Sequence, residues 1–402
     1  MYLNRQYHLS YCTNIHQGET WDEVFQSLKE YFPPLKQQLS PDQPLGIGLR
    51  LSDLASRELM EGEELFNFKA WLQEQGLYVF TMNGFPFGGF HKQVVKDDVH
   101  QPDWTTKTRV AYTIRLAHIL SMLLPKGVEG GISTSPLSYK PWYTGKQEAY
   151  NETTRTATEN LVEVVAELIS IKSVTGKSIH IDIEPEPDGF LENSHEFISF
   201  YTNQLIPVGV EKLKQELSAA EVTEAIKEHI QLCYDVCHFA LAYEKPAETF
   251  DKLKEAGIKV GKIQLSAALK VTLPNNVTDK AAVAERLAAF VEPTYLHQVV
   301  ERGADNKLTQ YPDLPQALAQ INKPDAEEWR IHFHVPLFTD SYNGLLSTQG
   351  DIKAVLDILK QEQLTQHLEV ETYTWDVLPQ DLKKELHDSI QREMEWVIEN
   401  LK

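Results

Sequence analysis

The sequence contains only three cysteines, Cys12, Cys233 and Cys237, among its 402 residues. Cys233 and Cys237 are four residues apart rather than in a CxxC turn, so their spacing is not typical of a disulfide framework, a zinc site or a thioredoxin-type site. A reducing compartment is the simpler inference. The sequence also lacks an uncharged apolar run long enough to cross a bilayer, and its first residues lack the basic start of a signal peptide. These absences predict a soluble, cytoplasmic protein without direct membrane insertion.

Positive charge is scarce, because 38 Lys and Arg residues face 58 Asp and Glu residues and give a formal net charge of -20. A nucleic-acid partner needs a basic face, and an anionic membrane surface attracts basic segments, so the charge argues against both. We interpret the acidity as solvated helix faces. The sequence has no GxGxxG or P-loop spacing and no GxSxG elbow, which argues against a nucleotide cofactor and a nucleophilic serine.

Short apolar runs alternate with longer amphipathic stretches, which is typical of the parallel βα units of an α/β protein. Thr20 and Glu23 predict a capping box at the start of the first helix. Further helices are expected at 109–124, 153–171, 246–256, 352–360 and 380–401. Strands are expected at 7–13, 45–51, 77–82, 131–135, 178–184, 230–236, 260–265, 330–335 and 368–374.

These nine strand candidates exceed the eight of a (β/α)8 TIM barrel, which is the fold that the alternation favours. Either 330–335 belongs to an insert, or another assignment is wrong. Gly303–Asn306 predicts a hairpin turn between 295–302 and 308–311. We therefore expect a single domain spanning residues 1–402, with a hairpin insert at about 270–328 after the seventh strand.

Polar residues alternate with apolar ones inside several predicted strands. Such residues are costly to bury unless they are paired or bound to a metal, and the strand ends of this fold meet at one rim. The candidates are His180, Asp182 and Glu184; Asp235 and His238; Gln264 and Ser266; His332 and His334; and Glu369 and Glu371. Carboxylate, imidazole and amide groups suit a divalent cation, although a metal-free polar pocket is the alternative. Taken alone, a strand histidine can be structural, and for Glu369 we favour pairing with a Lys or Arg or capping of a helix.

The sequence resembles the xylose isomerase-like barrels and, more narrowly, the metabolite traffic protein EboE family. The resemblance is carried by HLSYCTNIHQGETWDEVF, LGIGLRLS, YVFTMNGFPFGGFH, HIDIEPEPDG, CYDVCH, HFHVPLF and HLEVETYTW, which extend over residues 7–375. It implies a xylose isomerase-like TIM barrel that binds one divalent ion (Mn, Zn, Mg or Fe). The narrower family is associated with moving or preparing a small metabolite for export.

By position, the resemblance implies metal ligands at Glu184, Asp235, Gln264 and Glu371, with His238 near the substrate. Gln264 departs from the pattern, because a histidine is expected there. His334 or His332 would substitute if their strand reaches the barrel mouth. The resemblance further implies that Glu184 and Glu371 act as acid and base beside a carbonyl, and that His238 contacts a substrate hydroxyl or donates a proton.

An aromatic loop follows the third predicted strand, and it would suit a partly apolar ligand. The alternative is a loop whose phenylalanines form a satellite core. With the imidazoles, the predicted substrate-binding residues are Asn83, Phe85, Phe87, His91, His180 and His332.

The leading hypothesis is a metal-dependent isomerase, epimerase or related lyase acting on a small hydroxylated or carbonyl metabolite. The alternative is a non-catalytic metabolite carrier or scaffold, with other members of a transport system as partners. Gln264 favours the carrier and the paired glutamates favour the enzyme. Phosphodiester cleavage is disfavoured by the net charge of -20.

Overall fold

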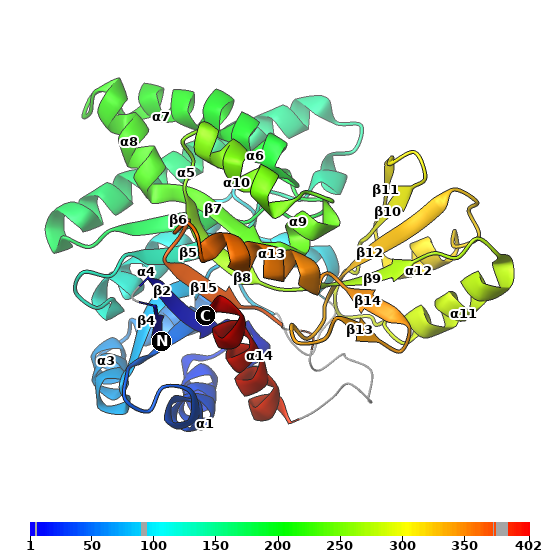
Figure 1. Cartoon of the computed structure of the whole chain (residues 1–402). Helices are drawn as coiled ribbons and strands as arrows, with labels where there is room; N and C mark the ends of the chain where they lie inside the picture. The colour runs from blue at the N-terminus through cyan, green and yellow to red at the C-terminus, as the bar shows by residue number, and fades with distance from the viewer. Residues whose placement is uncertain (5, 90–94, 373, 375–384) are drawn as a thin grey trace.

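The computed structural model describes residues 1–4, 6–89, 95–372, 374 and 385–402 (Figure 1). Its main sheet has nine strands, of which the short β1 (Tyr2–Leu3) is antiparallel to its neighbour and the others are parallel. The parallel strands are β2 (Tyr7–Tyr11), β3 (Leu45–Arg50), β4 (Leu77–Asn83), β5 (Gly130–Thr134), β6 (Ile179–Ile183), β7 (Ile230–Asp235), β8 (Val260–Leu265) and β15 (His367–Val370).

The parallel strands close into a barrel. From β3 to β8 each strand pairs with the next in the chain, and β15 lies between β8 and β2. A parallel bridge between Cys12 and Gly48 joins the two open sides, and Gly48 N donates to Ser10 Oγ at 2.9 Å. The predicted (β/α)8 barrel is therefore confirmed, with eight strands whose carboxyl ends meet at one mouth.

Helices surround the barrel (Figure 1). Thr20 and Glu23 form the expected capping box at the start of α1. The termini lie together, because Asn4 Nδ2 donates to Leu401 O at 3.3 Å. The helices outside the insert are α1 (Trp21–Leu39), α2 (Asp53–Leu59), α3 (Glu64–Gln75), α4 (Lys107–Leu123), α5 (Gln147–Thr175), α6 (Ser194–Phe200), α7 (Ile206–Leu213), α8 (Ala219–His229), α9 (Val236–Leu241), α10 (Pro246–Glu255), α13 (Gln349–Leu359) and α14 (Leu386–Leu401).

A second sheet, of six strands, lies between β8 and α13 in the chain and projects to one side of the barrel (Figure 1). The predicted hairpin is confirmed, because Val299–Gly303 pairs antiparallel with Leu308–Tyr311. The predicted strand at 330–335 lies in this insert and not in the barrel, which resolves the excess of strand candidates. The elements are β9 (Ala268–Thr272), α11 (Val277–Ala288), β10 (Val299–Gly303), β11 (Leu308–Tyr311), α12 (Leu314–Leu318), β12 (Ala326–His334), β13 (Ser341–Tyr342) and β14 (Leu345–Ser347).

The barrel interior is polar and is built to accommodate acidic side chains. Asp182 points between two glycine positions: a Cβ on Gly261 would lie 1.8 Å from Asp182 Oδ1, and one on Gly131 would lie 2.5 Å from Asp182 Oδ2. Lys262 Nζ and Glu369 Oε2 form a fully buried ion pair at 2.7 Å. The expectation that Glu369 pairs with a cation is thus confirmed.

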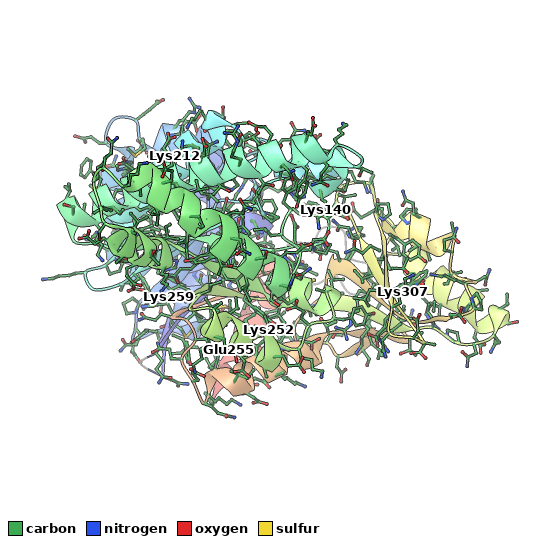
Figure 2. The ribbon with its side chains drawn as sticks, turned by 90° about the horizontal axis from the view of Figure 1, so that it is seen from above. Lys140, Lys212, Lys252, Glu255, Lys259 and Lys307 are labelled. Atoms are coloured by element: carbon green, nitrogen blue, oxygen red, sulfur yellow. The ribbon has the colours of Figure 1, made fainter. Side chains whose placement is uncertain are left out.

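Several lysine side chains lie on the outer surface (Figure 2). Figure 2 shows Lys212 and Lys252 on the outside of the helices and Lys307 at the hairpin of the insert. Among the residues that the structure describes, no helix is both long and apolar enough to span a bilayer.

Candidate metal centre at the barrel mouth

Three carboxyl groups from the ends of β6, β7 and β15 meet at the mouth, across the strand β8 that separates β7 from β15. Glu184 follows β6, Asp235 ends β7 and Glu371 follows β15. One carboxylate oxygen of each lies within 4.8 Å of the others, and all three side chains are buried. The strand-end positions that the sequence singled out for Glu184, Asp235 and Glu371 are therefore brought together.

Backbone hydrogen bonds hold these residues at the rim. Glu184 N donates to Thr134 O and Glu371 N donates to Leu265 O, both at 3.0 Å, so each glutamate continues the hydrogen-bonding ladder to the adjacent strand. Asp235 caps α9, because its Oδ1 accepts from His238 N at 3.0 Å and from Ser266 Oγ at 2.7 Å. The three carboxyl groups thus sit on rigid strand ends rather than on loops.

The electrostatics of the cluster are unfavourable without a cation. Burial, followed by the neighbouring Asp235 charge, raises the pKa of Glu184 well above its usual value, and burial with the charge of Glu184 does the same for Glu371. Within the described part of the chain, Glu184 Oε2 and Asp235 Oδ2 are buried and have no hydrogen-bond partner. Buried oxygen atoms without partners fit a bound divalent ion, which would supply the missing positive charge.

Imidazole groups come from the insert and from α9. His334, at the end of β12, donates from Nδ1 to Glu371 O at 2.8 Å. One ring nitrogen of His334, one of His238 and one oxygen of Asp235 lie within 4.8 Å of one another. The hydrogen bond from Nδ1 to a carbonyl oxygen fixes the tautomer that presents Nε2 as a ligand, so His334 suits the metal centre.

Gln264 takes a different position from the one that the resemblance implies. Its Oε1 accepts a hydrogen bond from Cys233 Sγ at 2.7 Å inside the barrel. His334 is placed beside Asp235 instead, and His332 lies one pleat away on the same strand. The insert therefore brings imidazole to a mouth whose seventh strand carries none.

The mouth opens into a pocket with about 620 Å³ of empty space. Its lining includes Glu184 and Glu371 of the carboxyl cluster and the apolar or aromatic side chains of Phe85, Val95, Val99 and Tyr295. Lys96, at the edge, is engaged by Asp313 at 2.7 Å. The pocket thus combines an ion-binding floor with a partly apolar wall.

The predicted substrate-binding residues are divided between three places. Asn83, Phe85 and His332 line the pocket. Phe87 packs edge-on against Tyr112 outside the pocket lining, and His91 lies outside the described residues. His180 is not brought to the mouth: it bonds Asp182 at 2.6 Å and lines a different cavity, together with His367.

Asn14, Glu186 and His100 were not singled out as site residues, although all three line the pocket. Asn14 Nδ2 donates to Glu371 Oε1 at 2.8 Å, and Asn83 Nδ2 donates to the same oxygen at 3.2 Å. Asn14 follows the first strand and Glu186 follows Glu184 by two residues, so their place beyond strand ends was the available signal. No comparable pattern marks His100.

No family model matches this chain, and no curated protein matches it significantly. Similar solved structures include the IolI protein with a binding zinc atom (11% identity, 98% of each chain covered, TM-score 0.47). They also include a xylose isomerase domain protein from Planctomyces limnophilus (13% identity, 91% of each chain, TM-score 0.45). A third is the probable 3-DHS dehydratase AsbF from Bacillus anthracis (11% identity, 97% of each chain, TM-score 0.43). These structures include xylose isomerase-like barrels, and likeness at this level carries no argument about activity.

Proposed function

We propose that Glu184, Asp235, His334 and Glu371 hold one divalent metal ion, and that the protein is a metal-dependent isomerase or epimerase of a small hydroxylated carbonyl compound. The observation that supports this most is the group of three buried carboxyl groups within 4.8 Å, two of which present an oxygen atom without a partner in the described chain. His334 is proposed as the fourth ligand in preference to Gln264, because Gln264 Oε1 is engaged by Cys233.

A divalent ion at this position supplies polarisation of a substrate carbonyl oxygen. Glu371 is oriented by Asn14 and Asn83, which both donate to its Oε1. Glu184 Oε2 has no such donor within the described residues, so Glu184 is the better proton acceptor at the carbon beside the carbonyl. Glu371, whose pKa burial raises, carries the proton that is returned. In an epimerisation Glu371 gives it to the opposite face of the same carbon. In an isomerisation it gives it to the former carbonyl carbon while the neighbouring hydroxyl proton moves to the former carbonyl oxygen, so neither reaction needs a redox partner.

The wall of the pocket sets the class of substrate. Phe85 and Tyr295 provide apolar surface, whereas His238 and His332 line the part of the wall that would contact substrate hydroxyl groups. We therefore propose a substrate with a hydroxylated carbonyl end and an apolar portion. Membership of the EboE family, a link to metabolite export and a cytoplasmic location are further parts of this proposal, and they rest on the sequence resemblance and composition.

Metal content tests the proposal. By mass spectrometry, the purified chain should carry about one tightly bound Mn, Zn, Fe or Mg ion at the carboxyl cluster before chelation and none after it. The Glu184→Gln, Glu371→Gln double variant should lose that ion. Glu301→Gln is the matched control, because Glu301 is a buried glutamate of the insert that pairs with Lys323 and takes no part in the cluster.

Each candidate ion is then added back to the chelated chain and its binding is measured by calorimetry. If no ion binds, or if the double variant binds as the wild type does, the metal-enzyme proposal fails. For a metal-loaded chain, incorporation of deuterium from D2O into hydroxy-carbonyl compounds reports removal of the proton beside the carbonyl. Binding of such a compound without exchange would assign the barrel to the alternative class, a metabolite carrier.

A further inference from the structure

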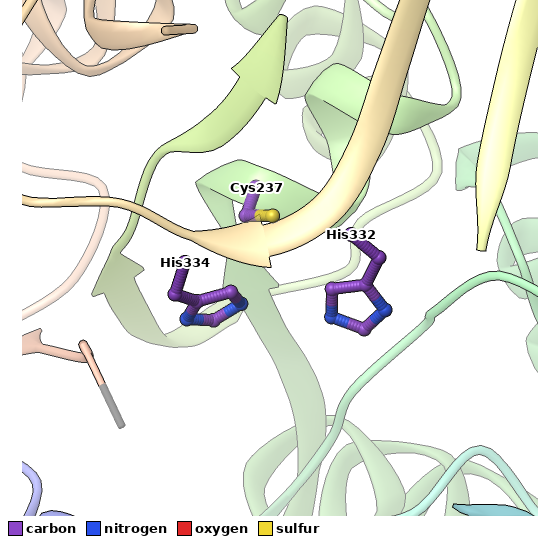
Figure 3. Close-up of side chains that lie close together, drawn as sticks. All are labelled: Cys237, His332 and His334. Atoms are coloured by element: carbon purple, nitrogen blue, oxygen red, sulfur yellow. The ribbon is translucent and has the colours of Figure 1, made fainter. Parts of the chain in front are cut away.

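Two imidazole rings face each other beside the carboxyl cluster. His238 Nε2 and His332 Nε2 are 3.1 Å apart, and the rings are nearly perpendicular, at 83°. His332 and His334 project from the same face of β12, and Figure 3 shows both rings directed toward the space between them, with Cys237 beside it. The rings lie directly beside the carboxyl cluster, because His238 Nδ1 is 3.6 Å from Glu184 Oε1 and His238 Nε2 is 4.0 Å from Asp235 Oδ1.

The hydrogen bonds of the two facing rings fix where their protons are. His238 Nδ1 donates to the carbonyl oxygen of Pro185 at 3.1 Å, and His332 Nδ1 donates to Gln298 Oε1 at 2.9 Å. The orientation of the Gln298 amide is supported by its nitrogen, which donates to Pro187 O at 3.4 Å. Both partners of the Nδ1 atoms are acceptors only, so each neutral ring carries its proton on Nδ1.

It follows that the two Nε2 atoms present lone pairs to each other at 3.1 Å. Two acceptors at this distance repel unless a proton or a metal ion lies at the site. A carboxylate is also at hand, because one oxygen of Glu186 lies within 4.8 Å of a ring nitrogen of each histidine. All three side chains are buried apart from the face that lines the pocket, so an ion can reach the site from the pocket while the protein shields the rest of it from water.

Glu186 is itself held in place by its surroundings. Its backbone N donates to Leu191 O at 3.1 Å, and its Oε1 lies 3.3 Å from His100 Nε2. Gln298 positions His332 twice, because the backbone N of His332 also donates to Gln298 O at 2.9 Å. Fixed second partners of this kind orient His332 as a metal ligand, whereas Glu186 Oε1 is buried without a hydrogen-bond partner among the described residues and could bind an ion.

We propose that Glu186, His238 and His332 form a second cation site, separate from the carboxyl cluster. Two imidazoles and one carboxylate select a first-row transition ion such as Zn²⁺ or Co²⁺ over Mg²⁺ or Ca²⁺. The inference goes beyond the proposed function, because none of its ligands is needed to hold the ion at Glu184, Asp235, His334 and Glu371. An ion at this second site would bind substrate hydroxyl oxygen atoms, since His238 and His332 line the pocket.

Cobalt titration of the chelated full-length chain tests the second site. Co²⁺ absorbs visible light with an intensity that depends on its ligands, and calorimetry counts the equivalents bound. We expect two equivalents for the wild type. His332→Gln and the nearly isosteric Glu186→Gln should each weaken one of the two by at least tenfold and change the absorption of that equivalent. Glu371→Gln should weaken the other equivalent and leave unchanged the Co²⁺ absorption that depends on His332 and Glu186.

His229→Gln is the matched control, because His229 is a buried histidine whose Nδ1 also donates to a carbonyl oxygen, that of Ile179, away from the mouth. Circular dichroism establishes that each variant is folded. The second site is ruled out if the wild type binds a single equivalent that depends on Glu371 and not on His332, or if folded His332→Gln and Glu186→Gln both retain two; the facing rings then share a proton. If the function proposed above fails instead, one equivalent remains that depends on His332 and not on Glu371.

Discussion

Buried acidic residues inside the barrel fall into two kinds, those held by a close hydrogen bond or ion pair below 3 Å and those that face other acidic groups. Asp182 is bonded to His180 at 2.6 Å, and Glu369 is paired with Lys262 at 2.7 Å. Glu184 and Glu371 instead face each other's charge, and burial raises the pKa of both. The partners of Asp182 and Glu369 offset the cost of burying these acids, whereas Glu184 and Glu371 carry a cost that a bound ion would offset.

At the residue scale, the buried pair of Lys262 and Glu369 gives a prediction of stability. Lys262→Met should lower the free energy of unfolding by about 3–5 kcal/mol, because it leaves Glu369 buried without its cation. Replacing both residues by apolar ones should recover most of that loss. Urea denaturation measures both variants.

The exposed pair of Lys245 and Glu248 is the control, and Lys245→Met should produce no measurable change. If the single and the double variant at Lys262 and Glu369 lose the same free energy of unfolding, the loss does not come from leaving Glu369 without its cation.

At the scale of elements, the sequence predicted the barrel strands and six of the helices, because their periodicity is local. Glu184, Asp235 and Glu371 were predicted as neighbours because each directly follows, or ends, an apolar run. The place of β12 could not be predicted, since it depends on antiparallel pairing with β9 and β10, which are distant in sequence. His334 was for this reason left as an alternative to Gln264.

Alternation predicted the face of the strand on which His180 lies, but not its position along the barrel axis. His180 and Glu184 share the inward face, but four residues of a strand span about 13 Å. His180 therefore lies toward the opposite end of the barrel, where it lines a cavity with His367. Alternation along a strand predicts which face a residue occupies, and it does not distinguish the mouth from the far end.

Helix α14 gives a prediction of pH dependence. Glu393 is buried in it, accepts from Leu337 N at 3.1 Å and from Thr372 Oγ1 at 2.9 Å, and burial raises its pKa to about 8. Between the ordinary glutamate pKa and about 8, the unfolded chain has released this proton while the folded chain keeps it. Stability from this group should thus be complete at low pH and fall by about 1.4 kcal/mol per pH unit as the pH rises through that window.

Glu393→Gln should remove this component of the pH dependence, as measured by urea denaturation from pH 5 to about 8. The control is Glu301→Gln, because hydrogen bonding and the Lys323 charge lower the pKa of Glu301 despite its burial. A Glu393→Gln variant whose stability changes with pH as steeply as that of the wild type would show that Glu393 is ionised in the folded chain.

At the scale of the whole molecule, the two ends of the barrel differ in what they hold. The mouth gathers Glu184, Glu186, Asp235 and Glu371 with the imidazoles of α9 and the insert, whereas the far end carries the paired His180 and Asp182. Barrels of this kind place function at the carboxyl ends of their strands and stability at the other end. The insert therefore acts on the site from outside the barrel, by supplying side chains that the eight strands lack.

This division predicts opposite effects of one substitution with and without metal. In chelator, Glu184→Gln should raise the free energy of unfolding by about 1–2 kcal/mol, because it removes a buried acid from a repulsive cluster. For the wild type, a divalent ion at a hundred times its Kd should add about 2.7 kcal/mol, and Glu184→Gln should lose most of that gain. Urea denaturation with and without the ion measures both effects.

Glu301→Gln, as control, should keep the full gain from the ion. An equal gain in Glu184→Gln would remove Glu184 from the ligand set, and a loss of stability in chelator would mean that the carboxyl cluster is not repulsive.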